Sequence, residues 1–241
     1  MMDRVNDFSR IQNYYPYIAH CSLPTTFVML RDTEIAALSA GEKKGPGVDR
    51  VVRRLDEAMA PFPRKRFVGT DFSAPTDSER YLSSRRGLVT SGAEAWDELT
   101  DSEKLKDLAA SGGVRCISVR AFRVFDVPRE FRLFVRNGEL KAMSQRFLVR
   151  HFHRLERRRA EYWDLACEFV ESCRGLFPVS DFSMDIYITS GKSILVLDLN
   201  PWGDPTERLM LHSWEDDFSK PLGCLIVPPP HTLSGDVNVS F

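Results

Sequence analysis

The chain has 241 residues, 43% of them hydrophobic, so it can bury a sizeable core in one large domain or two small lobes. Its 33 basic residues nearly balance 34 acidic ones, which excludes a strong overall charge preference for nucleic acid or a membrane surface. Because no apolar run approaches the roughly 20 residues of a membrane span and the first residues lack a signal-peptide core, we expect a soluble, cytoplasmic monomer.

The first half of the sequence predicts strands and helices in alternation. A short strand is expected over residues 25–30, and residues 48–59 place apolar side chains at helical spacing with charges between them. A cation-rich strand over 64–68 follows Pro61 and Pro63. Two short helices within 93–110 and an alternating strand over 114–121 complete this half.

Asn137-Gly138 is the strongest turn signal in the chain and predicts a hairpin of residues 130–136 with 139–145. If Arg136 pairs with Glu139, one face is core and carries Phe131, Leu133, Val135, Leu140, Ala142 and Ser144. The other face then carries Glu130, Arg132, Phe134, Lys141, Met143 and Gln145. Its cations suit the binding of phosphate oxygens, and a solvated outer face explains the same pattern equally well.

A basic segment leads from this hairpin into a helix that ends near Cys173. Its arginines suit contact with RNA or a polyanionic partner, but few aromatic residues lie between them, which favours a solvated helix face. His151 and His153 form a His-x-His pair that we interpret as part of a basic surface turn rather than as metal ligands. The cysteines contain no Cys-x-x-Cys pair, so we expect reduced, packed thiols.

A second hairpin is predicted from residues 181–189 and 193–200, with Ser190 and Gly191 as the turn. This turn places Asp185 opposite Val196 and sets Asp185, Asp198 and Asn200 on one face. Two carboxylates and an amide supply the hard oxygen ligands that Mg²⁺ prefers. The alternative is that Asp198 caps a turn and Asp185 is a solvated strand residue, but three such residues on one face favour a metal site.

Four short segments, in this order and spacing, resemble the cell division cycle protein 123 family. They are Glu-Phe-Arg-Leu-Phe-Val at 130–135, Ser-Gln-Arg at 144–146, Met-Asp-Ile-Tyr at 184–187 and Asp-Leu-Asn-Pro-Trp-Gly at 198–203. The resemblance covers roughly residues 67–214. It implies an α+β, ATP-grasp-like fold in which two lobes with antiparallel sheets enclose a cleft for ATP and Mg²⁺. We place the lobes at residues 1–121 and 122–241.

The resemblance also implies roles for individual residues. Asp185, Asp198 and Asn200 correspond to the magnesium ligands, Arg132 faces the nucleotide phosphates, and residues 119–122 form the adenine-side hinge. Gly69 stands where the family has a phosphate-binding lysine, so Arg66 or Lys65 is expected to substitute. The complete set expected to bind the nucleotide is Arg66, Arg120, Phe122, Glu130, Arg132, Lys141 and Gln145.

Two classes of function agree with this reading. In the first, the protein is a Mg-ATP-binding assembly chaperone with slow or no turnover, whose partner is translation initiation factor 2, through its gamma subunit, or an analogous protein. In the second, it is an ATP-grasp ligase or transferase that activates a carboxylate. Nucleic acid and membranes are not expected as partners of either.

Overall fold

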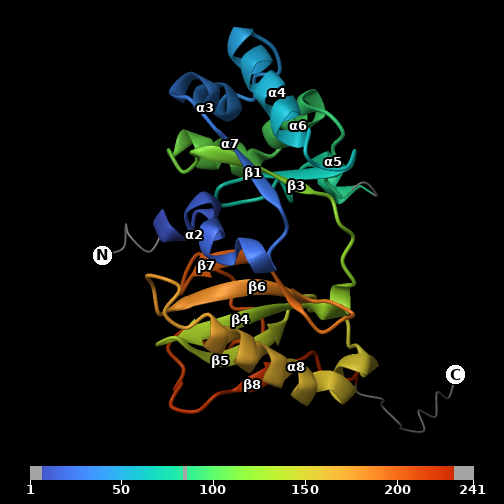
Figure 1. The fold of residues 1–241 in the computed structure, drawn as a ribbon, viewed down its shortest axis with the longest axis vertical. Coiled ribbons are helices and arrows are strands. Elements are labelled where there is room, and N and C mark those ends of the chain that lie inside the picture. The colour runs from blue at the N-terminus through green and yellow to red at the C-terminus, as the bar shows by residue number, and fades with distance from the viewer. Residues whose placement is uncertain (1–6, 84–85, 231–241) are drawn as a thin grey trace, which may run out of the picture.

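Two β-sheets, each with its own apolar core, follow one another along the long axis of the molecule (Figure 1). The computed structural model describes residues 7–83 and 86–230. Within this part of the chain, no helix has both the length and the apolar character needed to cross a membrane. The first sheet belongs to the N-terminal lobe and the second to the C-terminal lobe.

The N-terminal lobe has a three-stranded antiparallel sheet in the order β1-β3-β2. Its strands are β1 Thr25–Met29, β2 Arg66–Thr70 and β3 Cys116–Ala121. Helices cover the face of this sheet that points away from the second lobe (Figure 1): α3 Asp32–Ser39, α4 Pro46–Met59, α6 Gly92–Thr100 and α7 Glu103–Ala110. The short α5 Glu79–Leu82 lies beside the sheet, and its Tyr81 faces the cleft. The apolar stripe of α4 is buried as its spacing predicted, whereas α3 was not expected.

The C-terminal lobe has a five-stranded sheet in the order β7-β6-β4-β5-β8. Its strands are β4 Glu130–Arg136, β5 Glu139–Gln145, β6 Phe182–Ile188, β7 Ile194–Pro201 and β8 Gly223–Leu225. All neighbours are antiparallel except β5 and β8, which are parallel. The chain enters this sheet through η2 Val127–Arg129, and α8 His153–Ser172 lies along one face (Figure 1).

The face of the C-terminal sheet toward α8 is apolar. One row of paired residues runs across all five strands of this face and is buried throughout: Leu199, Met184, Leu133, Met143 and Cys224. Helix α8 packs onto this core, as does α2 Ile11–Ile18, which is followed by η1 Ala19–Cys21. Helix α2 was not predicted, and it joins the core of the second sheet although it precedes the first sheet in sequence.

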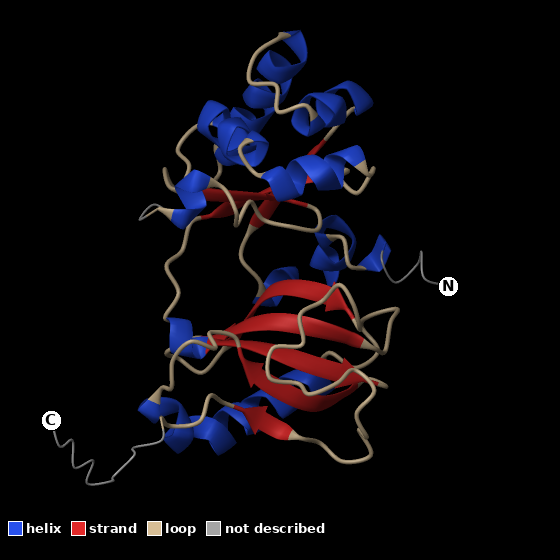
Figure 2. Cartoon of the chain, turned by 180° about the vertical axis from the view of Figure 1, so that it is seen from behind, coloured by secondary structure: helices blue, strands red, loops and turns tan. Residues whose placement is uncertain are grey.

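The opposite face is polar near the N-terminal lobe and apolar farther away. The adjacent row on this face reads Asp198, Asp185, Arg132 and Ser144 across four strands. Beyond it, Phe134 is buried by Leu211, Trp214 and Phe218 from the chain that follows β7. Figure 2, from the opposite side, shows loops crossing this face while α8 lies behind the sheet.

The predicted hairpin of β4 and β5 has the expected turn but a different register beyond it. Arg136 pairs with Glu139 as predicted, but a β-bulge at Lys141 shifts the pairing, so that Phe134 lies opposite Ala142. Gln145 therefore pairs with Phe131 and shares its face. The prediction that Met143 and Gln145 share the face of Arg132 is wrong, because the inserted residue, Lys141, reverses the alternation of the β5 residues that follow it. Ala142 and Ser144 lie on the face of Arg132 instead.

The predicted hairpin of β6 and β7 has a different turn, yet its face assignment is correct. Ile188 pairs with Ile194, so residues 189–193 form the connection and the predicted two-residue turn is wrong. A bulge then places Asp185 opposite Asp198 rather than Val196. Asn200 lies opposite Ser183, two residues from Asp185 along β6, so the prediction of one shared face for Asp185, Asp198 and Asn200 is confirmed.

Candidate functional site

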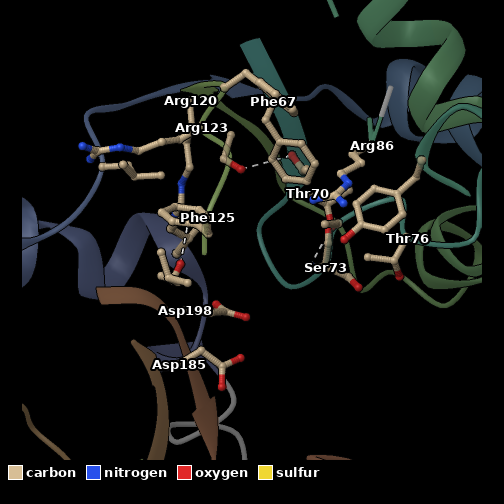
Figure 3. Close-up of a pocket in the computed structure, with 18 of the residues that line it drawn as sticks. Phe67, Thr70, Ser73, Thr76, Arg86, Arg120, Arg123, Phe125, Asp185 and Asp198 are labelled. Atoms are coloured by element: carbon tan, nitrogen blue, oxygen red, sulfur yellow. Dashed lines mark hydrogen bonds between the residues drawn. The ribbon is translucent and has the colours of Figure 1, made fainter. Parts of the chain in front are cut away.

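A cleft of about 300 Å³ lies between the two lobes, a size that accommodates a small ligand. Asp185 and Asp198 line it from the C-terminal sheet, and the loop after β2 lines it from the N-terminal lobe. Figure 3 shows the two carboxylates on one side of the space and Phe67, Ser73 and Arg86 on the other. The cleft thus combines acids from one sheet with aromatic, hydroxyl and cationic groups from the opposing lobe.

Asp185 is held by a bidentate ion pair. Arg132 Nε lies 2.7 Å from Asp185 Oδ1 and Arg132 Nη2 lies 2.8 Å from Oδ2, because the two residues are direct neighbours on β4 and β6. The third guanidinium nitrogen, Nη1, donates to the carbonyl oxygen of Glu207 at 2.7 Å. Both side chains are buried, at 7% and 4% exposure, so the guanidinium compensates a carboxylate that water does not solvate.

Arg146 is a second cation on the same carboxylate; the sequence placed it in a family segment and in the basic run after the hairpin, but not in the site. Its Nη1 lies 2.7 Å from Asp185 Oδ2, and its backbone NH donates to the carbonyl of Glu130. The bulge in β5 places Arg146 beside Glu130, where the predicted register had Gln145. The Arg146 side chain is 40% exposed, whereas that of Arg132 is buried, so Arg146 is the more accessible cation of the two.

Asp198 accepts a hydrogen bond from Tyr14 of helix α2, near the start of the chain. The Tyr14 hydroxyl donates to Asp198 Oδ1 at 2.9 Å, and the Leu199 backbone NH donates to the same oxygen at 3.0 Å. Burial raises the pKa of Asp198, and the negative charge of Asp185 raises it further. Burial and the charge of Asp198 also raise the pKa of Tyr14, so the phenol stays a donor.

Glu130, Arg120 and Phe122, all expected to bind the nucleotide, line the cleft. Burial raises the pKa of Glu130, while Arg146 opposes this shift and Asp185 adds to it. Arg120 Nη1 donates to the carbonyl of Leu197 at 2.8 Å, whereas its buried Nη2 has no partner among the described residues. Phe122 lies at the start of the segment that joins the lobes, and its backbone NH donates to the carbonyl oxygen of Lys65.

Lys141 and Gln145 do not line the cleft, which corrects their expected placement. Lys141 Nζ pairs with Glu139 at 2.7 Å and borders a separate hollow near residues 216–219. The Gln145 amide donates to the carbonyl of Arg150 at 2.9 Å and accepts from the backbone of Val227 at 3.1 Å. Lys141 is the bulged residue itself, whereas Gln145 follows the bulge and therefore lies on the face of Phe131.

Arg66 is also absent from the cleft lining. Its guanidinium donates to the carbonyls of Met59 at 3.0 Å and Phe62 at 3.2 Å, at the end of α4 and just beyond it. Cations near a helix C-terminus satisfy carbonyls that have no partner within the helix. Arg66 therefore supports α4 instead of replacing a phosphate-binding lysine, and the exposed Lys65 does not line the cleft either.

Asn200 shares the face of the two aspartates but borders the neighbouring hollow, beside Pro201 and Thr206. Its Nδ2 and the Oγ of the paired Ser183 are both buried without a partner among the described residues. Uncompensated buried polar atoms are uncommon and point to a ligand or ordered water. The hydrogen bonds to Asp198 from Tyr14 and from the Leu199 backbone both go to Oδ1.

Aromatic residues that the sequence analysis did not single out give the cleft flat apolar walls. Phe67 of β2 packs at a tilt on Tyr81, with ring centroids 6.3 Å apart. Phe125 packs on Tyr187 of β6 with centroids 4.7 Å apart. Such walls suit a planar ring, while the carboxylate pair has the hard oxygen donors that suit Mg²⁺, so the residues present fit a metal-bound nucleotide.

Comparison with known proteins places the chain in one family. The model of the D123 family matches residues 93–220. A relative from Danio rerio, the translation initiation factor eIF2 assembly protein, is 32% identical over 88 residues, which are 36% of this chain and 25% of that protein. Cell division cycle protein 123 from Candida glabrata is 35% identical over 89 residues, 36% of this chain and 24% of that protein. These matches span about a quarter of each relative's length.

The solved structure of C-terminally truncated Cdc123 from Schizosaccharomyces pombe superposes with a TM-score of 0.80. The match covers 94% of this chain and 98% of that chain, at 17% sequence identity. The fold is therefore shared across both lobes. The expected α+β fold with two lobes is confirmed, and so is the resemblance drawn from the four sequence segments.

Proposed function

Because the chain belongs to the D123 family, we propose that it is a Mg-ATP-binding assembly chaperone for translation initiation factor 2. Relatives from fish and amphibians carry the name of an eIF2 assembly protein, which supports this partner. The gamma subunit is the proposed point of contact, and the cytoplasm is the proposed location. The nucleotide would fix the relative position of the lobes and thereby the shape that the partner meets.

The observation that carries the nucleotide proposal is the pairing of Asp185 with Asp198 at the cleft. The negative charge of Asp185 still raises the pKa of Asp198 although Arg132 and Arg146 both bind Asp185, so a divalent cation at the pair would relieve a repulsion that the arginines leave in place. Asp185 and Asp198 would hold Mg²⁺, with Asn200 contributing its amide oxygen from the adjacent position. When bound, the ion neutralises phosphate oxygens.

Arg132 and Arg146 have different parts in this proposal. Arg132 is buried and bound to two acceptors, so it keeps Asp185 oriented whether or not a ligand is present. Arg146 is 40% exposed and shares Asp185 Oδ2. We expect it to leave that oxygen free for a metal and turn to the phosphates, together with Arg86 at the cleft.

Calorimetric titration with ATP in excess Mg²⁺ tests the metal ligands. Asp198→Asn removes one ligand charge and should weaken ATP binding about tenfold or more, since affinity for hard cations depends on the charge of the ligands. Asp164→Asn makes the same change on the exposed surface of α8 and should leave the affinity unchanged. Unchanged binding in a folded Asp198→Asn protein would remove Asp198 from the site.

A second experiment separates the chaperone from a ligase. Immobilised protein is offered purified translation initiation factor 2 with and without Mg-ATP, while phosphate release is followed in parallel. The chaperone proposal expects ATP to strengthen capture with little turnover, because a ligand favours a partner only through its preference for the competent state. Rapid phosphate release coupled to amide formation with added amines and carboxylic acids would favour the ligase instead.

A further inference from the structure

A compact group of metal-ligating side chains lies at the start of α8, outside the cleft lining. It consists of His151, His153 and Glu156, whose ligand atoms all lie within 4.8 Å of one another. His153 Nδ1 is 3.3 Å from Glu156 Oε2, and His151 Nε2 is 3.9 Å from Glu156 Oε1. His151 precedes α8, and His153 and Glu156 lie in its first turn, so the start of the helix brings the three ligands together.

His151 has the hydrogen-bonding pattern of a metal-ligating imidazole. Its Nδ1 lies 2.8 Å from the carbonyl of Val227, and a carbonyl only accepts, so Nδ1 carries the proton. In the neutral ring, Nε2 then presents a lone pair. This Nε2 is buried without a hydrogen-bond partner among the described residues. Metal-bound histidines characteristically donate their other ring N–H to a carbonyl or carboxylate.

The loop and the C-terminal segment hold His151 in this orientation. The Gln145 side chain bonds the carbonyl of Arg150 at 2.9 Å and the backbone NH of Val227 at 3.1 Å. The residue before His151 and the residue that accepts from it are therefore fixed by one amide. This cross-connection explains why the His-x-His pair looked like a simple surface turn in the sequence, where Val227 is remote.

The spacing of the three ligands suits zinc. Zinc bonds nitrogen and carboxylate oxygen at about 2.0–2.2 Å, so tetrahedral ligand atoms lie about 3.3–3.6 Å apart. The His153–Glu156 separation of 3.3 Å, measured to Oε2, fits this range. The His151–Glu156 separation of 3.9 Å, measured to Oε1, is longer, and one ligand atom of each residue lies within 4.8 Å of the other two. His153 is 80% exposed in its side chain, which leaves it free to adjust and leaves room for a water as fourth ligand.

The neighbouring cations do not occupy the carboxylate. Arg154 binds Asp126 at 2.6 Å, and Arg158 binds Glu161 at 3.1 Å. Within the described part of the chain, Glu156 forms ion pairs with the two histidines alone. Imidazole nitrogen prefers borderline ions over Mg²⁺ or Ca²⁺, so the ligand set selects a transition ion rather than the hard cation suited to the cleft.

We propose that His151, His153 and Glu156 form a zinc site that joins the start of α8 to the chain around Val227. Bound zinc would give the buried His151 Nε2 the partner that it lacks among the described residues. Because His151 also binds Val227, the ion would link the segment after β8 to the start of the helix. The site has no residue in common with the cleft, so it stands independently of nucleotide binding.

Zinc titration of protein freed of metal, in excess Mg²⁺ to occupy hard oxygen sites, tests this proposal. The unaltered protein should bind one zinc ion, and His153→Ala and Glu156→Gln should each weaken binding by about 10- to 100-fold. Both side chains are exposed, so these variants should stay folded, whereas His151→Ala also loses the Val227 contact. His212→Ala removes an exposed histidine 3.6 Å from Asp216 and serves as the matched control.

Cobalt substitution supplies a readout that loss of stability cannot imitate. A site of two imidazoles, a carboxylate and water should give visible cobalt absorption without the thiolate charge-transfer band that cysteine ligands produce. Equal zinc affinity in unaltered protein and His153→Ala, or equal weakening by His212→Ala, would overturn the site. Asp198→Asn should leave zinc binding unchanged, which keeps failure of this proposal distinct from failure of the nucleotide proposal.

Discussion

The two hairpins of the C-terminal sheet meet at the site, and each contains one β-bulge, but the bulges have opposite consequences. In β4–β5 the turn is regular and the bulge at Lys141 moves every later residue of β5 to the other face. In β6–β7 the longer turn shifts the pairing by one residue, and the bulge before Asp198 shifts it by one more. Two shifts restore the original alternation, since the side-chain period of a strand is two.

This difference shows that a face assignment depends on the parity of the shifts and not on the register itself. Asp185 and Asp198 share a face although their predicted pairing is wrong. Gln145 is on the wrong face although the turn of its hairpin is right. The single shift also brings Arg146 next to Glu130, so the bulge in β5 exchanges an amide for a cation at the edge of the cleft.

The largest expected loss of stability comes from removing the ion pair between Arg132 of one hairpin and Asp185 of the other. Arg132→Ala leaves Asp185 buried with only Arg146, and the free energy of unfolding should fall by about 3–5 kcal/mol in urea denaturation. Arg146→Ala removes the half-exposed partner of the same carboxylate and should lower it by at most about 1 kcal/mol. A double change of Arg132→Met with Asp185→Leu should recover most of the loss.

Equal losses for the two arginine variants would show that burial does not distinguish them. The ion pair between Arg132 and Asp185 would then add no more to the stability of the sheet than the exposed contact of Arg146, and backbone pairing alone would join the two hairpins.

A smaller effect is expected at the turns. Gly138 has φ +71°, and a methyl group on its Cα would meet only Arg174 Cγ, at 4.0 Å. Gly138→Ala should therefore lower the free energy of unfolding by about 1–2 kcal/mol through the backbone alone. Lys192 has φ +65° in the other turn without being glycine. Lys192→Gly should be more stable than Lys192→Ala by about 1 kcal/mol, both variants having lost the ion pair with Glu161.

Thermal or urea denaturation of these three variants measures the difference between a regular and a strained turn. If Lys192→Gly and Lys192→Ala unfold alike, the positive φ of Lys192 carries no energetic consequence.

The smallest effect concerns pH. Burial raises the pKa of Glu130 in the folded protein above its value in the unfolded chain. Between these two values the folded state binds more protons, so the free energy of unfolding falls as pH rises, by at most about 1.4 kcal/mol per pH unit. Glu130→Gln should flatten this decline, leaving the part due to Asp198, whose pKa is also raised.

Glu139 in the same hairpin is the control of opposite sign. The hydrogen bond and charge of Lys141 lower the pKa of Glu139, so its contribution is present at higher pH and is lost as pH falls through its folded pKa. Glu139→Gln should therefore not flatten the decline at higher pH. Denaturation curves at several pH values decide between the two residues, and an unchanged slope in Glu130→Gln would contradict the role of burial.

Local patterns in the sequence predicted much of the fold. The helical spacing of α4, the Asn137-Gly138 turn and the carboxylates of β6 and β7 all have short-range signals. Bulges lack such a signal, because neither Lys141 nor Leu197 differs from an ordinary strand residue. Contacts between residues far apart in the sequence could not be predicted from local patterns either. Tyr14 is separated from Asp198 by most of the chain, and the carbonyls near the end of α4 that bind Arg66 have no signal in the sequence.

Helix α2 has a mechanical consequence for the cleft. Arg10, its N-cap residue, pairs with the buried Asp71 of the N-terminal lobe, and Tyr14, one turn later, binds Asp198 of the C-terminal lobe. Four residues of helix rise only about 6 Å, so α2 is a short strut between the lobes. The covalent link from β3 to η2 lies on the opposite side of the molecule (Figure 1). The chain also crosses between the lobes where η1 leads into β1, with Ser22 bridged to Val196 of the C-terminal sheet. With connections on both sides, we expect the two lobes to change their separation less than their relative tilt.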